Sequence, residues 1–505
     1  MSIRMSVAEY RTDGQIRKLE KLTQPVRLGV DVFRTGHIGA EAMRAACRVL
    51  ADFARELEAY GVEEYRAIAT TAVRDSDNAP AFLDRVRLGS GLIVEVVDGL
   101  EETRLNYQMM RHLIGHRFGL LETNSLVVAI GSGSVEILVL EAGEVLFAES
   151  RPVGTLRLIE GLEVRTERQA RRLLTDFIED MTQSIARLFP SLPFERLFVI
   201  SSDLRALAAR LTGTSTTEDP RVRVVGRDVF DRIRGELQEL DLAGRSDRLG
   251  LPLEEAETVL PAAIMLGSYW NLTSAKEAVF VDFSMLDSLL LDLVRRNLPG
   301  TREEDFDRQV VSAALALGGR YEFDEAHALQ VRRLALTLFD DLTSLHGLGA
   351  RPRLLLEIAA ILHDIGLYVN PSSHHKHSMY LIQASGLMGL SAADMQIIAL
   401  TARYHRKAVP SRNHEELRVL DSDAQLVVSK LASLLRLAEA LDRGHQQAIG
   451  ELRASVDGAE VILLAESDQD LSLEEWSLQL KSNLFESLYG YPIRLRIRRH
   501  LPGVS

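Results

Sequence analysis

The sequence predicts a multidomain α/β protein that continues into a helical region and closes with a small α+β segment. Strands and helices alternate through about the first three hundred residues. From about residue 303 to residue 441 the apolar spacing is helical and contains no good strand, and short alternating segments then return. At 505 residues the chain exceeds the size at which one core keeps growing, so two to four domains are expected.

The composition is that of an ordinary globular protein, with 46% hydrophobic and 26% charged residues. No apolar run reaches the roughly 18 residues of a spanning helix, and the N-terminus has no signal-peptide core, so we expect a cytoplasmic protein without membrane contact. The single cysteine, Cys47, excludes an intrachain disulfide and a cysteine-cluster metal site. The net charge of −13 argues against general nucleic-acid binding.

The stretch SLVVAIGSGSVEILVL, residues 125–140, predicts a strand, a tight turn and a second strand. The turn is Gly131-Ser132-Gly133-Ser134. Glycine permits close backbone approach, so consecutive amides in such a turn can form a nest for an anion such as phosphate. A plain β-hairpin explains the same residues equally well, and the turn alone does not separate the two.

The elements before this stretch begin with a hairpin in residues 3–22, turning at Asp13-Gly14. After it we expect helices at 41–60, 79–86 and 101–114 and strands at 65–70 and 92–97. Beyond the stretch the pattern predicts helices at 167–188, 204–211, 253–269 and 286–296, with strands at 197–201, 222–225 and 278–283. A turn at Asp457-Gly458 and a strand at 493–497 indicate the closing α+β segment.

The beginning of the chain is weakly similar to residues 134–145. Both SIRMSVAEYRTDGQI, residues 2–16, and SVEILVLEAGEV contain a serine, an alternating strand, an acidic residue, a glycine turn and a returning strand. In the second copy a strand and glycine-rich turn precede the serine, whereas the first copy has no residues there. Either the first half never had a phosphate turn, or this chain begins too late to include it.

Three charged residues are candidates for chemistry in the α/β region. Glu101 and Glu102 open the helix at 101–114, and adjacent helical residues point about 100° apart, so only one of them can face a given site. Two interpretations of the pair stay open. The glutamates stabilise the helix as acidic charge at its N-terminus, or one of them is a catalytic base. Arg74 follows a strand, at the end where α/β folds bind ligands, but it also suits a solvated loop.

Histidines are concentrated in and just after the helical region, since nine of the 13 lie between His327 and His445. His363-Asp364 interrupts an apolar helix, where an imidazole and a carboxylate are costly unless they are coordinated or hydrogen-bonded. Such residues suit a divalent metal whose bound water attacks a phosphoryl group, although a single histidine more often has a structural role. The other members of the ordered set are His327, His374, His375, His377, His405 and Asp442.

Taken together, these residues resemble the exopolyphosphatase and guanosine pentaphosphate phosphatase (Ppx/GppA) family over nearly the whole chain. The motifs that carry the resemblance are VRLG (26–29), ATTAVRDSDN (69–78), EETRL (101–105), IGSGSVE (130–136), RPVGTLRL (151–158), HHKHSMYLI (374–382) and ARYHRKA (402–408). The resemblance implies an α/β actin-like fold of two ribonuclease-H-like halves with phosphates between them, followed by an all-α HD-like domain. It also implies a homodimer.

On this basis four domains are expected. They are a first actin-like half at 1–122 that lacks its first strand and phosphate turn, a second half at 123–302, a helical HD-like domain at 303–446 and a small α+β C-terminal module at 447–505.

The resemblance also implies roles for individual residues. Glu102, the second of the pair, matches the glutamate that orients or deprotonates the water attacking a terminal phosphoanhydride. Arg74, Gly131, Gly133 and Ser134 match phosphate-binding positions, and Glu136 matches a position that handles Mg²⁺. In the HD-like domain, a divalent metal is expected at His327, His363, Asp364 and Asp442, with His377 and His405 as accessory residues.

The chain departs from the family pattern at several positions around the phosphates. Ala129 replaces an aspartate and Ser132 a glycine of the second turn. Residues 201–203 are Ser-Ser-Asp, whereas the family has a glycine-rich turn before a threonine at this place. In addition, Phe283-Ser284 replaces a glycine pair, and Leu286 replaces an arginine. If the aspartate that Ala129 replaces anchors a metal in a phosphoryl-transfer site, its loss is expected to reduce transition-state stabilisation by roughly several kcal/mol.

Three functions therefore stay open from the sequence. The first is a phosphatase that hydrolyses polyphosphate or guanosine pentaphosphate with Mg²⁺ and Glu102. The second is a polyanion-binding protein whose only catalytic site is the HD-type metal site. The third is a regulatory protein in which both sites are vestigial.

Overall fold

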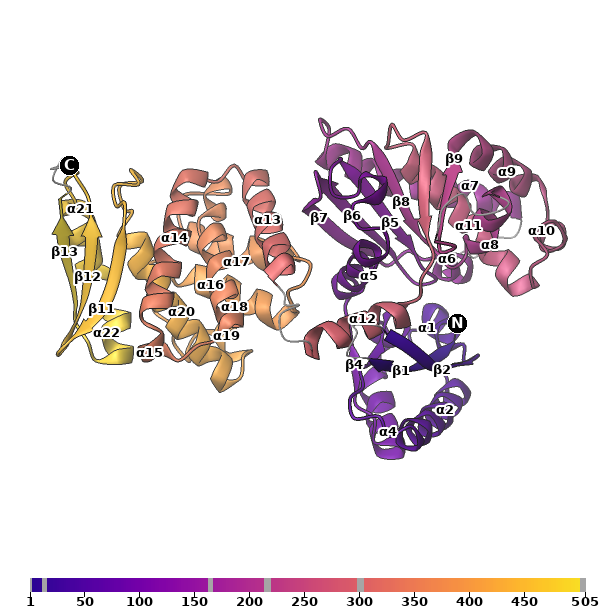
Figure 1. The fold of residues 1–505 in the computed structure, drawn as a ribbon, viewed down its shortest axis with the longest axis horizontal. Helices are drawn as coiled ribbons and strands as arrows, with labels where there is room; N and C mark the ends of the chain where they lie inside the picture. The colour runs from indigo at the N-terminus through magenta and orange to yellow at the C-terminus, as the bar shows by residue number, and fades with distance from the viewer. Residues whose placement is uncertain (1, 11–15, 162–166, 213–218, 298–303, 500–505) are drawn as a thin grey trace. The chain divides into compact units, whose positions relative to one another are not determined.

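A computed structural model describes residues 2–10, 16–161, 167–212, 219–297 and 304–499 of the chain (Figure 1). The contacts divide it into two compact units, Met1–Glu303 and Glu304–Ser505. The boundaries expected after residues 122 and 446 stay predictions. None of the described helices is both long enough and apolar enough to cross a membrane.

The first unit begins with the expected hairpin, in which β1 (Ile3–Tyr10) pairs antiparallel with β2 (Ile16–Gln24). The expected Asp13-Gly14 turn lies outside the described residues. Two helices follow, α1 (Leu28–Thr35) and α2 (Ala40–Ala59). The apolar face of α2 buries Met43, Ala46 and Phe53, as its helical spacing predicts.

The next elements lead to the glutamate pair. They are β3 (Ala67–Ala69), α3 (Thr71–Arg74), α4 (Ala79–Ser90), β4 (Val94–Val96) and α5 (Gly99–Ile114). Strand β3 pairs parallel with β4. Asp98 caps α5 by accepting a hydrogen bond from the Glu101 amide, so both glutamates lie in the first turn of this helix.

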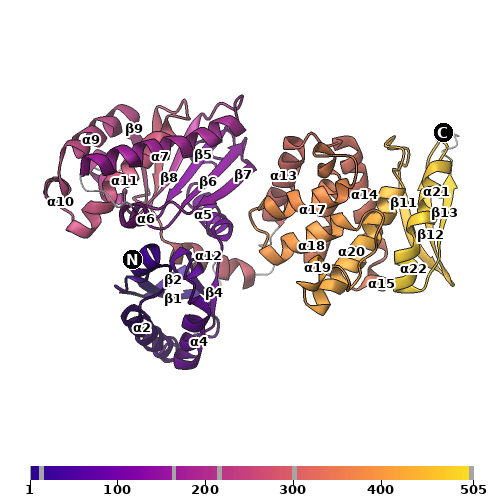
Figure 2. The same cartoon turned by 180° about the vertical axis from the view of Figure 1, so that it is seen from behind.

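A six-stranded mixed sheet forms the main core of the first unit, in the order β7-β6-β5-β8-β10-β9. Strands β5, β6 and β7 form an antiparallel meander, β8 and β10 run parallel to β5, and β9 is antiparallel at the edge. The long helix α7 lies across one face of this sheet (Figure 2). The bounds are β5 (Ser125–Ile130), β6 (Val135–Glu141), β7 (Glu144–Arg151), α7 (Glu167–Leu188), β8 (Arg196–Ile200), β9 (Val222–Gly226) and β10 (Glu277–Val281).

The turn between β5 and β6 lies where the sequence predicts it. The Gly131 amide donates to the Ser134 carbonyl at 3.0 Å and closes the turn. In the antiparallel register Ala129 lies directly opposite Glu136, so their side chains are on the same face of the sheet.

Seven further helices of the first unit are described. Helices α9 and α10 fall in a segment for which the sequence pattern predicted no element. The bounds are η1 (Arg117–Gly119), α6 (Thr155–Gly161), α8 (Arg205–Thr212), α9 (Arg227–Glu239), α10 (Leu242–Leu249), α11 (Leu253–Trp270) and α12 (Met285–Asn297).

The second unit starts with helices, as the sequence predicts, and buries its apolar residues between them. The helices are α13 (Glu304–Arg320), α14 (Glu325–Asp341), α15 (Thr343–His346), α16 (Ala350–Leu362), η2 (Ile365–Tyr368), α17 (His374–Ala384), α18 (Ala392–Arg403), α19 (Glu415–Arg418) and α20 (Ser422–Ala440).

A three-stranded sheet and two helices close the second unit. Strand β11 (Leu452–Asp457) pairs antiparallel with β12 (Glu460–Glu466), and β12 pairs parallel with β13 (Ile493–Arg498). The turn between β11 and β12 contains Gly458 at φ 58°, a backbone conformation that favours glycine. Helices α21 (Ser472–Lys481) and α22 (Asn483–Tyr489) connect β12 to β13.

Candidate functional sites

Glu102 is the more buried member of the glutamate pair and is held by one arginine, Arg74. Its side chain is only 8% exposed, and its Oε1 accepts a hydrogen bond of 2.9 Å from Nη1 of Arg74. Arg74 also donates to the Val97 carbonyl at 2.7 Å and to Thr71 Oγ1 at 3.1 Å. The guanidinium therefore fixes Glu102 and is itself fixed by two further acceptors.

Glu101 points to a different environment, as expected for its neighbouring helical position. Its carboxylate accepts hydrogen bonds from Arg66 at 2.9 Å and from Arg104 at 2.5 and 2.7 Å. Both arginines also bond to Asp292, which belongs to α12. Glu101 is thus fully engaged in a charged network that holds α5 against α12.

The network around Glu102 continues to the predicted phosphate turn. Thr71 Oγ1 lies 3.3 Å from Ser134 Oγ, and Ser134 Oγ donates to Glu136 Oε1 at 2.5 Å. We refer to Glu102, Arg74, Thr71, Ser134 and Glu136 as the Glu102 cluster. It brings together three elements that are distant in sequence, namely α3, the start of α5, and the β5–β6 turn with β6.

Burial changes the acidity of both carboxyl groups in the Glu102 cluster. It raises the pKa of Glu102, although the hydrogen bond from Arg74 opposes the change. Burial, followed by the nearby Glu102 charge, raises the pKa of Glu136 to about 8. At neutral pH Glu136 is therefore largely protonated in the free protein.

Two glycines allow the chain to approach the phosphate turn closely. A Cβ on Gly133 would lie 2.8 Å from Thr71 Cγ2, and a Cβ on Gly154 would lie 2.3 Å from the Gly133 nitrogen. Arg157, in the first turns of α6, donates to the Gly133 carbonyl at 2.9 Å and pairs with Asp75. Substitution of either glycine would therefore displace the turn from Thr71.

Two positions that the sequence was expected to have altered, Ala129 and Asp203, and one expected phosphate-binding glycine, Gly131, have defined neighbours in the structure. Ala129 offers no polar group beside Glu136, its direct partner across the strands. Asp203 accepts a 2.6 Å hydrogen bond from Thr155 Oγ1, at the first residue of α6. The Gly131 amide, expected to contact phosphate, is used to close its own turn.

In the second unit, His327 and Asp442 form a buried pair. His327 Nδ1 lies 2.8 Å from Asp442 Oδ2, and the other oxygen of Asp442 accepts from the Gln447 amide at 2.8 Å. The opposite ring nitrogen of His327, Nε2, is buried without a hydrogen-bond partner. Asp442, expected as a ligand, is thus placed behind His327, where it orients the ring.

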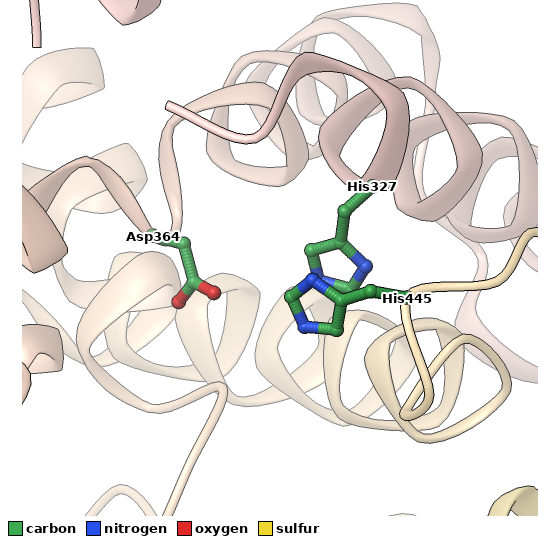
Figure 3. A group of neighbouring side chains, drawn as sticks. All are labelled: His327, Asp364 and His445. Carbon is green, nitrogen blue, oxygen red and sulfur yellow. The ribbon is translucent and has the colours of Figure 1, made fainter. Parts of the chain in front are cut away.

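His327, Asp364 and His445 approach one another from three segments of the second unit (Figure 3). The rings of His327 and His445 stack with centroids 3.6 Å apart, and Asp364 faces them. One potential ligand atom from each residue lies within 4.8 Å of the others. His445 is also engaged by Asp324, whose Oδ2 lies 2.9 Å from its Nδ1.

A second and tighter group contains Asp364, His374 and His405, which we call the Asp364 cluster. Asp364 Oδ1 lies 3.2 Å from His374 Nε2 and 3.4 Å from His405 Nε2. The two Nε2 atoms are 3.3 Å apart. Both imidazoles are buried, and Asp364 Oδ1 is buried without a hydrogen-bond partner.

The structure brings together most of the histidines that the sequence singled out, with two differences. His377 belongs to neither group of potential ligands among the described residues, whereas His374, three residues earlier in α17, belongs to the tighter one. His445 was not expected, and only its spacing after Asp442 could have suggested it. Burial lowers the pKa of His363 to about 4 and holds the pKa of His405 well below its usual range, so both rings are neutral.

Family profiles match two long parts of the chain. The profile of the Ppx/GppA phosphatase family matches residues 7–192, and that of Ppx/GppA phosphatase domain III matches residues 311–487. A guanosine-5'-triphosphate,3'-diphosphate pyrophosphatase of Vibrio vulnificus is 24% identical over 494 residues, covering 96% of this chain and 94% of that protein. A protein of the same name from Aliivibrio fischeri is 25% identical, and the alignment covers 91% of this chain and 87% of that protein.

Solved structures support the fold of part of the chain. A Ppx/GppA family member from Aquifex aeolicus superposes with a TM-score of 0.50 at 20% identity, covering 59% of this chain and 95% of that chain. An exopolyphosphatase from Cytophaga hutchinsonii superposes with a TM-score of 0.53 at 22% identity. The superposition covers 58% of this chain and 95% of that chain. With profiles of one family matching both units and relatives aligned over nearly the full length, the chain belongs to the Ppx/GppA phosphatase family.

Proposed function

We propose that this protein hydrolyses the terminal phosphoanhydride of guanosine pentaphosphate or polyphosphate, with Glu102 as the general base. The observation that carries the proposal is the buried Glu102 carboxylate, held by Arg74 and linked through Thr71 to Ser134 of the glycine turn. The names of the Vibrio and Cytophaga proteins supply the two candidate substrates.

In the proposed reaction a water oxygen attacks the terminal phosphorus, and the bond from that phosphorus to the bridging oxygen breaks. Glu102 takes the proton that the water loses, and the remaining phosphate chain leaves. Burial raises the pKa of Glu102 towards the range in which a carboxylate accepts a proton effectively near neutral pH. Arg74 keeps the accepting oxygen in place.

The residues of the Glu102 cluster fit a Mg²⁺ ion that is held largely by the substrate. Glu136 offers one carboxylate, and Mg²⁺ is commonly bound by one or two carboxylates together with phosphate oxygens. When bound there, Mg²⁺ would neutralise charge on the phosphates. Gly133 and Ser134 would contact the same phosphates from the turn.

The proposal is tested by the Glu102→Gln variant, which keeps the size of the side chain and removes the base. We expect kcat for phosphate release to fall roughly 10²–10⁴-fold, the usual contribution of general base catalysis. Phosphate release would be measured separately from guanosine pentaphosphate and polyphosphate. The matched control is Glu101→Gln, which removes charge from the neighbouring network. Equal, small losses in both variants would contradict the proposal.

A second candidate function is favoured by Ala129, which gives Glu136 no carboxylate partner across the strands. In it the first unit only binds a polyanion, and the helical unit is an HD-type phosphohydrolase with metal ligands among His327, His363, Asp364 and Asp442, assisted by His377 and His405. Asp364→Ala would then abolish phosphate release while Glu102→Gln preserves it. The opposite result supports the first function.

Two further parts of the proposal concern the whole protein. We propose that the helical unit is related to HD domains and that the protein works in the cytoplasm as a homodimer, as the family resemblance implies. Sedimentation analysis of the purified protein measures the oligomeric state, and a monomer across the micromolar range would contradict the dimer.

A further inference from the structure

We propose that the helical unit binds a divalent transition-metal ion of the size of Zn²⁺ through Asp364, His374 and His405. This inference goes beyond the hydrolysis proposed for the Glu102 cluster, because it concerns the other unit. The ligands also differ from the set expected from the sequence and used in the second candidate function, which named Asp442 as a ligand and left His374 among the wider group of candidate histidines.

The first argument is the spacing of the three donor atoms. Asp364 Oδ1, His374 Nε2 and His405 Nε2 form a nearly equilateral triangle with edges of 3.2, 3.3 and 3.4 Å. A tetrahedral ion with bonds of about 2.0–2.1 Å to nitrogen and oxygen separates its ligand atoms by about 3.3–3.4 Å. The protein therefore holds three ligand atoms at the separation that such an ion requires.

The second argument is the direction of the ring protons. His374 Nδ1 lies 3.1 Å from the Pro371 carbonyl, and His405 Nδ1 lies 2.6 Å from the Ala402 carbonyl, in each case three residues earlier. A carbonyl only accepts, so each Nδ1 carries the proton and each Nε2 presents a lone pair. A backbone carbonyl on the far nitrogen is the usual support of a metal-bound histidine.

The third argument is that this triangle is unfavourable without a cation. With both Nε2 atoms unprotonated, three lone-pair donors face one another at 3.2–3.4 Å and no hydrogen lies between them. Asp364 Oδ1 accordingly has no hydrogen-bond partner although it is buried. Burying such acceptors unsatisfied is costly, and an ion among them removes the cost.

Arg406 offers a competing arrangement that the experiment must exclude. Its Nη1 lies 3.3 Å from His374 Nδ1, and a guanidinium only donates. If His374 Nδ1 accepts that hydrogen bond, the ring proton of His374 is on Nε2, and Nε2 then donates to Asp364 Oδ1. The longer distance and the matching carbonyl contact at His405 favour the metal arrangement.

A third buried imidazole, that of His363, lies beside the Asp364 cluster. His363 Nε2 is buried without a hydrogen-bond partner and lies 3.7 Å from Asp364 Oδ2, while its Nδ1 contacts the Ala360 carbonyl at 2.8 Å in the same manner as the other two histidines. The Asp364 side chain is 18% exposed as a whole, although its Oδ1 is buried. Water or a phosphate oxygen is the class of ligand expected as the fourth donor.

The test is direct metal binding by the full-length protein after treatment with a chelator. Co²⁺ is titrated as a spectroscopic probe, and the affinity for Zn²⁺ is measured by competition with a chromophoric chelator. We expect tight binding by the unmodified protein and a loss of affinity of at least about 100-fold in His374→Ala and in His405→Ala, since losing a ligand exceeds the 10–100-fold effect of losing its support.

The controls separate this site from the alternatives. Glu415→Gln, an exposed carboxylate of the same unit, and His116→Ala, an exposed histidine of the other unit, should bind as the unmodified protein does. Should His405→Ala fail to fold, His405→Cys serves instead, because a thiolate ligand adds a charge-transfer band to the Co²⁺ spectrum. The proposal is overturned if the unmodified protein binds neither ion, or if the His374 and His405 variants bind with unchanged affinity.

Discussion

At the scale of single residues, Arg74 determines how Glu102 is presented. Its guanidinium donates to Glu102, to the Val97 carbonyl and to Thr71, and a lysine ammonium cannot reproduce that planar fork. We expect Arg74→Lys to lower kcat roughly 10–100-fold with little change in KM, as misplacement of a catalytic group does. Steady-state kinetics measure this, with the exposed Arg27→Lys as control. A rise in KM alone would instead identify Arg74 as a phosphate ligand.

Glu136 gives a second prediction at this scale, on the pH dependence of stability. Its folded pKa of about 8 exceeds the ordinary value of 4.5, so the folded state holds a proton that the unfolded state releases. The resulting stabilisation is complete below about pH 4.5 and is lost as the pH rises through about 8. Relative to Glu136→Gln, the unmodified protein should lose roughly 2–4 kcal/mol across this range.

Urea denaturation at several pH values measures this loss. The exposed Glu63→Gln variant should follow the unmodified protein at every pH. Parallel curves for Glu136→Gln and the unmodified protein would show that Glu136 is already ionised when folded.

At the scale of elements, Gly366 fixes the position of α17 against η2. A Cβ on Gly366 would lie 2.1 Å from the His374 carbonyl oxygen and 2.4 Å from the Ser378 nitrogen. Gly366→Ala should therefore destabilise the helical unit by about 1–3 kcal/mol, the usual cost of an added methyl group in a packed site. Gly349→Ala, where a Cβ would meet nothing within 4 Å, is the control. Equal free energies of unfolding for the two variants would contradict this role.

The same contact explains why the sequence predicted the histidine region but could not separate His374 from His377 within α17. His374 and His377 are three residues apart, so they lie on similar faces of a helix and their spacing does not distinguish them. The choice depends on how α17 rests on Gly366, which is a tertiary contact. The strand-turn-strand at 125–140, by contrast, was predictable because apolar alternation and glycine turns are local signals.

Two helices at 227–249 were not predicted, although α9 carries a local signal. Phe230, Ile233 and Leu237 recur at three- and four-residue spacing, and they pack in the core of the first unit. The rest of α9 is mostly polar and includes Gly235, which weakens the intrinsic propensity for a helix, so the apolar spacing is the signal that would have identified it.

At the scale of the whole molecule, each unit has buried clusters of its own. We expect two calorimetric transitions, because separate cores allow separate unfolding. Ile137→Ala, in the sheet of the first unit, should destabilise one transition by about 2–5 kcal/mol and leave the other unchanged. Leu434→Ala, in α20, should do the reverse. One shared transition that both variants shift would contradict independent units.

The register that places Ala129 opposite Glu136 also defines a test of what a carboxylate at position 129 would do. A side chain at this position lies on the same face of the sheet as Glu136, which accepts a hydrogen bond from Ser134. Ala129→Asp would set two carboxylates next to each other, an arrangement that a bound cation makes favourable. We expect this variant to bind Mg²⁺ more tightly than the unmodified protein and to release phosphate faster when Mg²⁺ is present. Unchanged Mg²⁺ affinity would show that position 129 contributes no metal ligand.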